Sequence, residues 1–210
     1  MDSPTIIYED EDVLALNKPA GLTVVELAEK YPQVTLAHRL DKETSGVILA
    51  AKNETALEYL RQLFRTGGIK KKYLALVYGH PPGGTIDLSI GRSRKDPRRR
   101  IAGKGATGKL REAVTEYRVL EELGKYSLLE VKPKTGRTHQ IRVHFKALGY
   151  PIACDGLYAP GRACPPPLGR QALHAESVEF IDQTGKKRLF RAVLPPDFQE
   201  ALDNIRRTGV

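Results

Sequence analysis

Most of the chain consists of short apolar runs separated by turns rich in Gly and Pro. The runs are only a few residues long and carry many strand-forming side chains, which is typical of β-strands. They predict strands at residues 6–8, 13–17, 46–51, 72–79, 114–120, 126–131, 178–181 and 189–194, with residues 22–25 also extended. The run at 46–51 is apolar throughout, so we expect it to be a buried strand.

Three further segments carry apolar residues at helical spacing. Asn53 is a suitable N-cap for the first, which we expect to end at Gly67. The second covers residues 138–148, and the third begins with Asp197 as its N-cap and Glu200 three residues later, the pattern of a capping box. Because strands and helices do not alternate strictly, the pattern predicts an α+β fold with a largely antiparallel sheet.

Composition narrows the class of protein. The 210 residues are 40% hydrophobic and 28% charged, which favours one globular domain and argues against a disordered chain. No run approaches the ~20 apolar residues of a membrane span. The N-terminus is acidic and lacks the basic and apolar regions of a secretory signal, so we expect a cytoplasmic protein with no membrane partner.

The charge of the chain is strongly positive and unevenly spread. Lys and Arg outnumber Asp and Glu by 34 to 25, a net charge of +9. The excess is concentrated at residues 70–72, 92–100 and 132–146. Solvated faces explain most charge runs, but basic clusters also bind polyanions by releasing condensed counterions. With three clusters on one chain, nucleic acid is favoured as the partner.

The segment Gly103–Lys109, GKGATGK, approaches two phosphate-binding patterns. It satisfies GxGxxG and nearly matches the phosphate loop of nucleotide-binding enzymes, except that Leu110 stands where a hydroxyl side chain is required. Both patterns need a buried strand before the loop, and the preceding run DPRRR cannot form one. We therefore expect a flexible basic loop; the alternative, a nucleotide-dependent RNA enzyme, predicts ATP binding at this segment.

Cys154 and Cys164 are the two cysteines of the chain. Two cysteines exclude a disulfide scaffold, and the nearby Asp155 and His174 match no recognised zinc-ligand spacing. We therefore expect two reduced thiols and no metal site.

The stretch at 36–52, LAHRLDKETSGVILAAK, places an acidic side chain shortly before a buried strand. Asp41 would therefore be held on a loop at the start of a rigid element. A carboxylate in this place can act as a general base, a metal ligand or a nucleophile. It can also simply form a turn with Thr44 and Ser45, and the segment alone leaves these roles open.

A second stretch, KPKTGRTHQIRVH at 132–144, puts many hydrogen-bond donors on one short helix. Helical spacing places Arg142 and Lys146 on one stripe with His139, turned away from the apolar face. The stretch is either a solvated basic helix start or a phosphate-binding helix N-terminus. Arginine is also the partner that keeps a buried carboxylate ionised.

Tyr73 lies in a third stretch, KKYLALV at 71–77. A tyrosine in a strand most often packs in the core. Beside a lysine cluster, its ring can instead be a stacking platform for a nucleotide base.

Together these three stretches resemble the RluA-type pseudouridine synthase family. HRLDKETSG is similar to the family's catalytic motif, KKYLALVYG to its tyrosine motif, and KTGRTHQIRVH with GYPIACDGLY to its basic motif. LALNKPAG and the Leu173-His174-Ala175 segment match further landmarks. The resemblance implies an α+β fold with a mixed, mainly antiparallel sheet and flanking helices. It also implies isomerisation of specific uridines in structured RNA to pseudouridine.

The resemblance further implies roles for individual residues. Asp41 resembles the essential aspartate, Tyr73 the tyrosine that packs on the target base, and Arg142 the basic residue that forms an ion pair with the aspartate. Arg39 resembles the arginine that fills the gap left by the flipped base. Further substrate contacts are expected from Arg137, His139 and Lys72.

The resemblance implies a single catalytic domain over residues 1–210, without the N-terminal S4 domain that many relatives carry. It implies neither cofactor nor metal, because the reaction only rearranges the atoms of the uridine. The expected partner is a stem-loop of ribosomal or transfer RNA, and the expected state is a monomer. The alternative is a non-catalytic RNA-binding or RNA-folding factor on the same scaffold, which would have no need for a desolvated aspartate–arginine pair.

Overall fold

The computed structural model describes residues 3–209 and divides the chain into two compact units. Unit 1 consists of Met1–Tyr73 and His174–Pro195, and unit 2 of Leu74–Leu173 and Pro196–Val210. The chain therefore passes from unit 1 into unit 2 after Tyr73 and returns to unit 1 at His174. It passes into unit 2 a second time after Pro195. A single domain over residues 1–210 stays a prediction.

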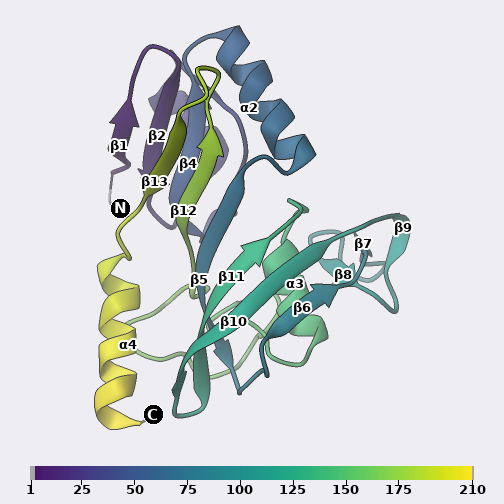
Figure 1. Ribbon diagram of the computed structural model, residues 1–210. Coiled ribbons are helices and arrows are strands. Elements are labelled where there is room, and N and C mark those ends of the chain that lie inside the picture. Colours follow the sequence, from purple (N-terminus) through teal and green to yellow (C-terminus); the bar gives the residue numbers. More distant parts are fainter. Residues whose placement is uncertain (1–2, 210) are drawn as a thin grey trace. The chain divides into compact units, whose positions relative to one another are not determined.

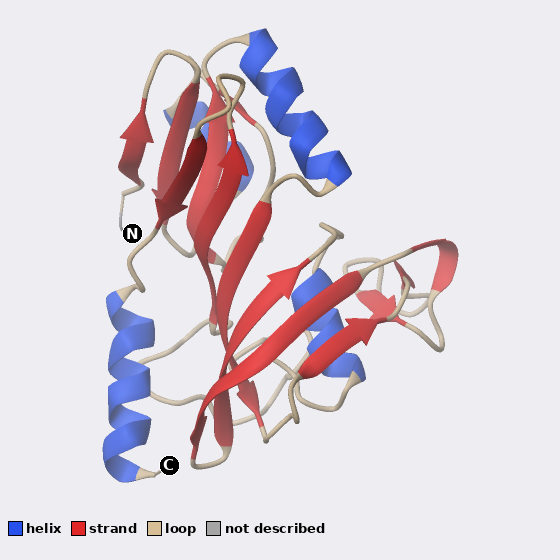
Figure 2. Ribbon diagram, viewed as in Figure 1, coloured by secondary structure: helices blue, strands red, loops and turns tan. Residues whose placement is uncertain are grey.

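Unit 1 is a sheet with two kinds of strand pairing (Figure 1, Figure 2). Its elements are β1 (Thr5–Glu9), β2 (Val13–Lys18), α1 (Val24–Lys30), β3 (Thr35–Leu36), β4 (Ser45–Ala51), α2 (Glu54–Thr66), β12 (Leu173–Ile181, from His174 onward) and β13 (Lys187–Arg191). The strands run in the order β1-β2-β4-β12, with β3 beside β4 and β13 beside β12. β4 and β12 are parallel, whereas β1–β2, β2–β4, β3–β4 and β12–β13 are antiparallel.

Strand β4 is the centre of unit 1 because every one of its residues is buried. Side chains alternate along a strand, so its two faces have different neighbours. Val47 and Leu49 pack in an apolar cluster with residues of α2, whereas Ile48 and Ala50 pack with Leu27 of α1 in a second cluster. The predicted buried strand is therefore confirmed, and its apolar run reflects burial on both faces.

Side-chain caps fix where the helices of unit 1 begin. Asn53 caps α2 as predicted, because its side chain accepts a hydrogen bond from the backbone N–H of Ala56 at 2.9 Å. Helix α1 begins within the segment 22–25, which the sequence predicted to be extended. There Thr23 and Glu26 form a reciprocal capping box, a helix signal that the short apolar run concealed.

Unit 2 has its own strand order, β5-β11-β10-β6, and a smaller sheet of order β8-β7-β9. Its elements are β5 (Lys70–Tyr78, from Leu74 onward), β6 (Gly84–Asp87), β7 (Ile90–Arg92), β8 (Arg100–Ala102), β9 (Thr107–Arg111), β10 (Val114–Leu123), β11 (Tyr126–Pro133), α3 (Gln140–Ala147) and α4 (Pro196–Thr208). The predicted hairpin of β10 and β11 is present and antiparallel. The predicted fold class, α+β with a mixed, mainly antiparallel sheet, is confirmed.

The prediction of a loop at 103–109 is wrong for residues 107–109, which belong to β9 of the small sheet, whereas residues 103–106 form a turn between β8 and β9. β8 and β9 pair on either side of β7. The sheet packs against α3 through an apolar cluster that includes Ile90, Ala102, Val143 and Tyr158. The apolar pattern did not reveal β9 because most of its side chains are exposed.

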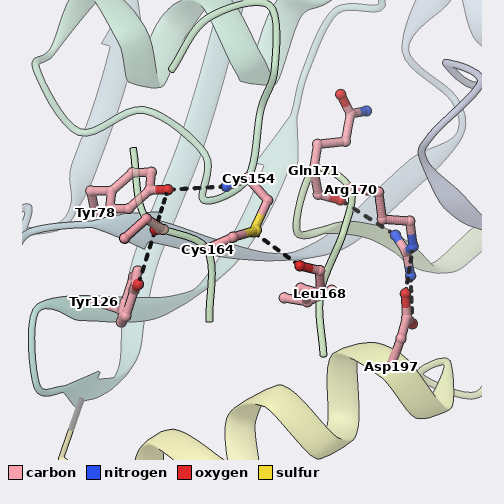
Figure 3. Close-up of a disulfide and its surroundings, with 9 residues drawn as sticks. Tyr78, Tyr126, Cys154, Cys164, Leu168, Arg170, Gln171 and Asp197 are labelled. Carbon is pink, nitrogen blue, oxygen red and sulfur yellow. Dashed lines mark hydrogen bonds and ion pairs between the residues drawn. A yellow bond between two sulfur atoms is a disulfide. The ribbon is translucent and has the colours of Figure 1, made fainter. Parts of the chain in front are cut away.

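Two predicted helix starts are shifted. Helix α3 begins at Gln140 because His139 has a left-handed backbone, with a φ of 57°. Helix α4 begins at Pro196, so Asp197 lies in its first turn and the predicted N-cap is wrong. The Asp197 carboxylate instead accepts hydrogen bonds from Nε and Nη2 of Arg170 (Figure 3).

Within residues 3–209, every helix is too short or too polar to span a membrane.

Cys154 and Cys164 form a disulfide, so the expectation of two reduced thiols is wrong (Figure 3). Their Cα atoms are 5.2 Å apart, an ordinary span for this bond. The Tyr78 phenol draws the loop together, since it accepts the backbone N–H of Cys154 and donates to the carbonyl of Ala163 at 2.8 Å. Cysteine spacing could not show this proximity, because it arises from contacts with a distant strand.

Candidate active site

Asp41 lies in the loop between β3 and β4, within the turn that the sequence predicted. Its carbonyl accepts the backbone N–H of Thr44 at 3.1 Å, which closes the turn before β4. Leu40 beside it is buried, whereas Asp41 is half-buried. The turn therefore holds the carboxylate at the boundary between the apolar core and the solvent.

A buried lysine that sequence reasoning missed ties this turn to β2. Lys18 has no exposed surface. Its Nζ donates to the carbonyls of Pro19, Leu22 and Lys42 at 2.8, 2.8 and 3.0 Å. Because Lys42 directly follows Asp41, the KPAG turn and the Asp41 turn are fixed relative to each other. The signal in the sequence was a lysine at the end of the apolar run LALNK.

The start of β4 is held against β12 by a polar pair and by a close backbone approach. Ser45 Oγ and His174 Nδ1 are 2.9 Å apart and buried. Gly46 has a φ of 116°, and a Cβ at this position would collide with the backbone of Ala175. The Ser-Gly pair of HRLDKETSG and the His-Ala pair of the LHA segment therefore interlock, although they lie far apart in the sequence.

His38 supports the Asp41 loop from a second direction. Its Nε2 accepts the backbone N–H of Leu49 at 2.9 Å, and its ring packs on Phe64. Burial, and then the positive charge of Lys71, lower the pKa of His38 to about 3. The imidazole is therefore neutral and anchors the loop to β4.

Tyr73, in β5, lies within electrostatic reach of Asp41. Burial raises the pKa of the Tyr73 phenol above its usual value, and the negative charge of Asp41 raises it further. The ring packs against an apolar cluster that includes Leu16 and Ile48. The structure thus brings two of the predicted catalytic residues together within unit 1 and keeps the phenol neutral at neutral pH.

The two substrate-binding candidates of unit 1 have different surroundings. Arg39 is exposed beside Asp41. Lys72 forms an ion pair with Glu176, with 2.7 Å between Nζ and the carboxylate oxygen and both side chains partly buried. A phosphate contact at Lys72 would have to share the ammonium with Glu176, so Arg39 is the more accessible of the two.

In unit 2, Arg142 is buried within α3. Every residue from Gln140 to Phe145 is buried, which excludes the alternative of a solvated basic helix start. Nε and Nη2 of Arg142 donate to the two carboxylate oxygens of Asp155 at 2.7 and 2.8 Å. A bidentate pair of this kind fixes the direction of the guanidinium.

Asp155, the partner of Arg142, is a residue that sequence reasoning considered only as a zinc ligand. It has no exposed surface. Its Oδ1 also accepts the backbone N–H groups of Leu157 and Tyr158, each at 3.0 Å. Buried carboxylates are rare unless they are paired, so the Asp within the apolar segment GYPIACDGLY was the available signal.

Tyr158 connects Arg142 with the residues before α3. The guanidinium carbon of Arg142 is 5.1 Å from the centroid of the Tyr158 ring. The Tyr158 hydroxyl is 3.0 Å from His139 Nδ1 and accepts the backbone N–H of Arg100 at 2.8 Å. The predicted residues His139 and Arg142 therefore share one tyrosine.

Gln140 holds the turn that carries Arg137. Its Oε1 accepts the hydroxyl of Thr135 at 2.7 Å and the backbone N–H of Arg137 at 2.9 Å. Its Nε2 donates to the carbonyl of Val114 at 3.0 Å. Nε of Arg137 donates to the carbonyl of Glu112 at 3.0 Å, which orients the guanidinium.

The predicted site residues divide between the two units. Unit 1 carries Arg39, Asp41, Lys72 and Tyr73, and unit 2 carries Arg137, His139 and Arg142. Among residues 3–209, no three His, Cys, Asp or Glu side chains are grouped as ligands of a metal ion would be. Unit 1 offers a carboxylate near a neutral phenol, a combination suited to nucleophilic or base chemistry beside an aromatic platform.

Comparison with known proteins adds independent information. The family described as RNA pseudouridylate synthase matches residues 12–147, a range that contains Asp41, Tyr73 and Arg142. A protein of Bacillus subtilis described as an uncharacterised RNA pseudouridine synthase is 37% identical, over 97% of this chain and 73% of the relative. The ribosomal large subunit pseudouridine synthase C of Vibrio cholerae is 36% identical, over 96% of this chain and 69% of its own.

Solved structures show the same similarity. Human RNA pseudouridylate synthase domain containing 1 has a TM-score of 0.82 and 29% sequence identity, covering 97% of this chain and 87% of that protein. Human RNA pseudouridylate synthase domain containing 4 has a TM-score of 0.77 and 26% identity, covering 96% and 92%.

Proposed function

Because the chain belongs to the RluA-type family of RNA pseudouridine synthases, isomerases that act on uridines in RNA, we propose that it modifies selected uridines in stem-loops of ribosomal or transfer RNA. Asp41 is the essential carboxylate in this proposal. The observation that carries it is that Asp41 lies near enough to Tyr73 in unit 1 for its charge to raise the pKa of the phenol. These two residues come from the two motifs, HRLDKETSG and KKYLALVYG, that first pointed to the family.

The reaction needs one ionised carboxylate and neither gains nor loses atoms. The N1–C1′ glycosidic bond breaks, the uracil rotates, the C5–C1′ bond forms, and the proton lost from C5 is balanced by one gained at N1. Asp41 acts either as a nucleophile at C1′ or C6 or as a base at C2′. The hydrogen bonds of Lys18 and Thr44 to its turn keep the carboxylate in one place during these steps.

Tyr73 binds the extruded base as a neutral ring. A uridine within a stem must leave the stack, which costs a few kcal/mol, and stacking on an aromatic face returns about 1–3 kcal/mol per base. Because burial and Asp41 raise the pKa of Tyr73, the phenol enters the reaction protonated. It therefore offers a ring face and a hydrogen-bond donor.

Arg142 supplies the positive charge opposite Asp41 in this proposal. Asp155 binds one edge of the guanidinium, and its planar fork of five donors can bind a second carboxylate at the same time. Such a pair keeps Asp41 ionised when the bound base excludes water. Asp155 is then a positioning residue, since it acts through Arg142.

The remaining assignments concern the RNA around the target uridine. Arg39 fills the gap that the extruded base leaves, and Arg137, His139 and Lys72 contact the surrounding strand. We propose the cytoplasm as the compartment and a monomer as the working state.

Tritium release from RNA transcribed with [5-³H]uridine tests the proposal, since each turnover exchanges the C5 hydrogen with water. Wild-type protein is expected to release tritium from ribosomal or transfer RNA. Asp41→Asn is expected to release none above background while binding the RNA as wild type does, because the amide keeps the shape but not the charge.

Glu29→Gln is the matched control, because Glu29 is an exposed carboxylate on α1 of the same unit. It removes the same charge and is expected to release tritium at the wild-type rate. Turnover by Asp41→Asn equal to that of Glu29→Gln would show that Asp41 is not the essential carboxylate. An inactive wild type on both RNA classes would contradict the proposed substrates.

A further inference from the structure

A basic groove with a volume of about 420 Å³ lies in unit 2, between the small sheet and the turn before α3. Its basic lining residues are Arg92, Arg100, Lys109, Arg111 and Arg137, and the other lining residues are Gly, Ile and Thr. The volume lies within the range of about 300–1,000 Å³ that is usual for small-ligand sites. We call this feature the basic groove.

The charges of the basic groove are not neutralised by the described part of the chain. Among residues 3–209, none of its five basic side chains forms an ion pair with a carboxylate. Arg98, a near neighbour in the sequence, is by contrast 2.9 Å from a carboxylate oxygen of Asp96. Like charges that converge without counter-ions repel one another, so a polyanionic ligand would relieve this repulsion.

Backbone irregularities aim the side chains into the groove. The pairing of β7 with β9 changes register between Ile90 and Arg92, so residues 108–110 bulge opposite Gly91. Gly108 supplies the left-handed φ of 72° in this bulge. A Cβ on Gly91 would lie 2.8 Å from the carbonyl of Thr107, so glycine is required for the strands to meet. The bulge presents Lys109 to the groove.

The basic groove adjoins the surroundings of Arg142 within unit 2. The backbone N–H of Arg100, a lining residue, donates to the hydroxyl of Tyr158. The ring of the same tyrosine lies against the Arg142 guanidinium. Arg100 in the basic groove and the proposed catalytic arginine therefore contact the same tyrosine.

We propose that the basic groove binds consecutive backbone phosphates of the RNA strand that flanks the target uridine. The inference rests on the proposed function and deepens it, since it says which surface holds the RNA and what that surface recognises. Arginine fits phosphate oxygens with two parallel hydrogen bonds. The lining contains neither an aromatic ring to stack a base nor a carboxylate to bind a ribose hydroxyl, so the groove recognises phosphates rather than sequence.

The glycine-rich segment GKGATGK acquires a function in this way. In nucleotide-binding proteins such a loop joins a strand to a helix whose N-terminus holds the phosphates. Here the segment joins β8 to β9 in a three-stranded sheet. A connection between two strands, with Lys109 lining the groove, suits an extended polyanion better than a free nucleotide.

Binding of a fluorescein-labelled RNA hairpin with a uridine-containing loop, measured by anisotropy from 50 to 400 mM NaCl, tests the inference. The groove variant is Arg92→Gln/Arg111→Gln, in which both substituted side chains are exposed. The control variant is Arg61→Gln/Arg65→Gln on α2, which removes the same charge from exposed positions of unit 1. A thermal melt of each variant confirms that it folds as wild type does.

The groove variant is expected to lower the slope of log Kd against log[NaCl] by about 1.4–1.8, because each lost phosphate contact removes about 0.7–0.9. Its affinity at 100 mM NaCl is expected to fall at least tenfold, whereas the control variant keeps the wild-type slope. Equal slopes for the two variants would overturn the inference, since only net charge would then matter. Tight binding of ATP that competes with the hairpin and is lost in the groove variant would overturn it too.

The proposed function fails separately, through the tritium assay. If wild-type protein releases no tritium but the groove and control variants differ in salt dependence as predicted, the inference about the basic groove stands. The proposed enzyme activity on these RNAs is then contradicted. If wild-type protein releases tritium but the groove variant binds the RNA hairpin as wild type does, only the inference about the basic groove is overturned.

Discussion

Arg142 and the basic groove show two opposite ways of holding positive charge in unit 2. Arg142 is 8% exposed and bound through two hydrogen bonds to the fully buried Asp155. The five basic residues of the groove have no carboxylate partner within residues 3–209. A built-in partner fixes the direction of a cation, whereas its absence leaves the charge available to a ligand. Arginine therefore serves positioning or binding according to the counter-ion that the chain provides.

Lys18 in unit 1 is a third case. Its buried ammonium donates to three backbone carbonyls, so it ties turns together through the main chain. The three cases predict different losses of unfolding free energy when a charge or its partner is removed.

The largest effect is expected for Asp155→Asn. Removing one partner of a buried ion pair leaves the other charge uncompensated, which typically costs about 3–5 kcal/mol of unfolding free energy. Urea unfolding at pH 7 measures the cost, and single-turnover tritium release is expected to fall with it because Arg142 is no longer oriented.

Two controls sharpen this prediction. Asp197→Asn weakens a bidentate pair with Arg170 in which Asp197 is 35% exposed, and it is expected to cost about 1 kcal/mol. The groove variant Arg92→Gln/Arg111→Gln is expected to stay within about 0.5 kcal/mol of wild type. If Asp155→Asn, Asp197→Asn and the groove variant all lost similar unfolding free energy, burial and pairing of a cation would not explain the cost of changing it.

A smaller effect is expected for Lys18→Met, which has nearly the same length. The substitution leaves three backbone carbonyls without their donor, at a cost of about 2–3 kcal/mol. The Asp41 turn should loosen as well, so tritium release is expected to fall more than in Lys30→Met, an exposed control at the end of α1. A Lys18→Met protein with wild-type stability would show that the ammonium is not needed to hold the turn.

The smallest effect is a dependence of stability on pH at His38. Its pKa in the folded protein is about 3, below the ordinary value of 6.5. The unfolded chain therefore binds the extra proton, so this contribution to stability is complete above pH 6.5 and decreases as the pH falls toward 3. Full burial would give a loss of at most about 2 kcal/mol between pH 6.5 and 5, and the half-buried ring should show less.

His38→Gln provides the comparison, because glutamine can accept the N–H of Leu49 but does not titrate. Urea unfolding at pH 7 and at pH 5 should show a smaller difference for His38→Gln than for wild type. Equal differences would mean that the imidazole is already accessible to protons in the folded state.

The fold could be predicted where the signal is local. β4 and α2 were recognised because an apolar run and an Asn N-cap stand directly in the sequence. Helix α1 was missed because its seven residues are too few for periodicity to outweigh an apolar start. The small sheet was missed because β7 and β8 are very short and most of β9 is exposed.

The same distinction between local and distant signals applies to the candidate site. The Asp41 turn was predictable because its hydrogen bond joins Asp41 to Thr44, which are close in the sequence. The roles of Lys18 and Asp155 were not, since Lys42 and Arg142 lie 24 and 13 residues from them and only folding brings these partners together. The resemblance to a family placed the catalytic residues, but it did not say which side chains hold them.

The course of the chain between the two units has a consequence for its synthesis. β4, which follows Asp41, completes its pairing only when β12 has been made, and unit 2 receives α4 later still. At ~5–20 residues per second, the edge of β4 stays open on the ribosome for on the order of ten seconds. An open strand edge is a template for wrong partners. Nascent chains of this protein should therefore depend on chaperones until β12 has been made.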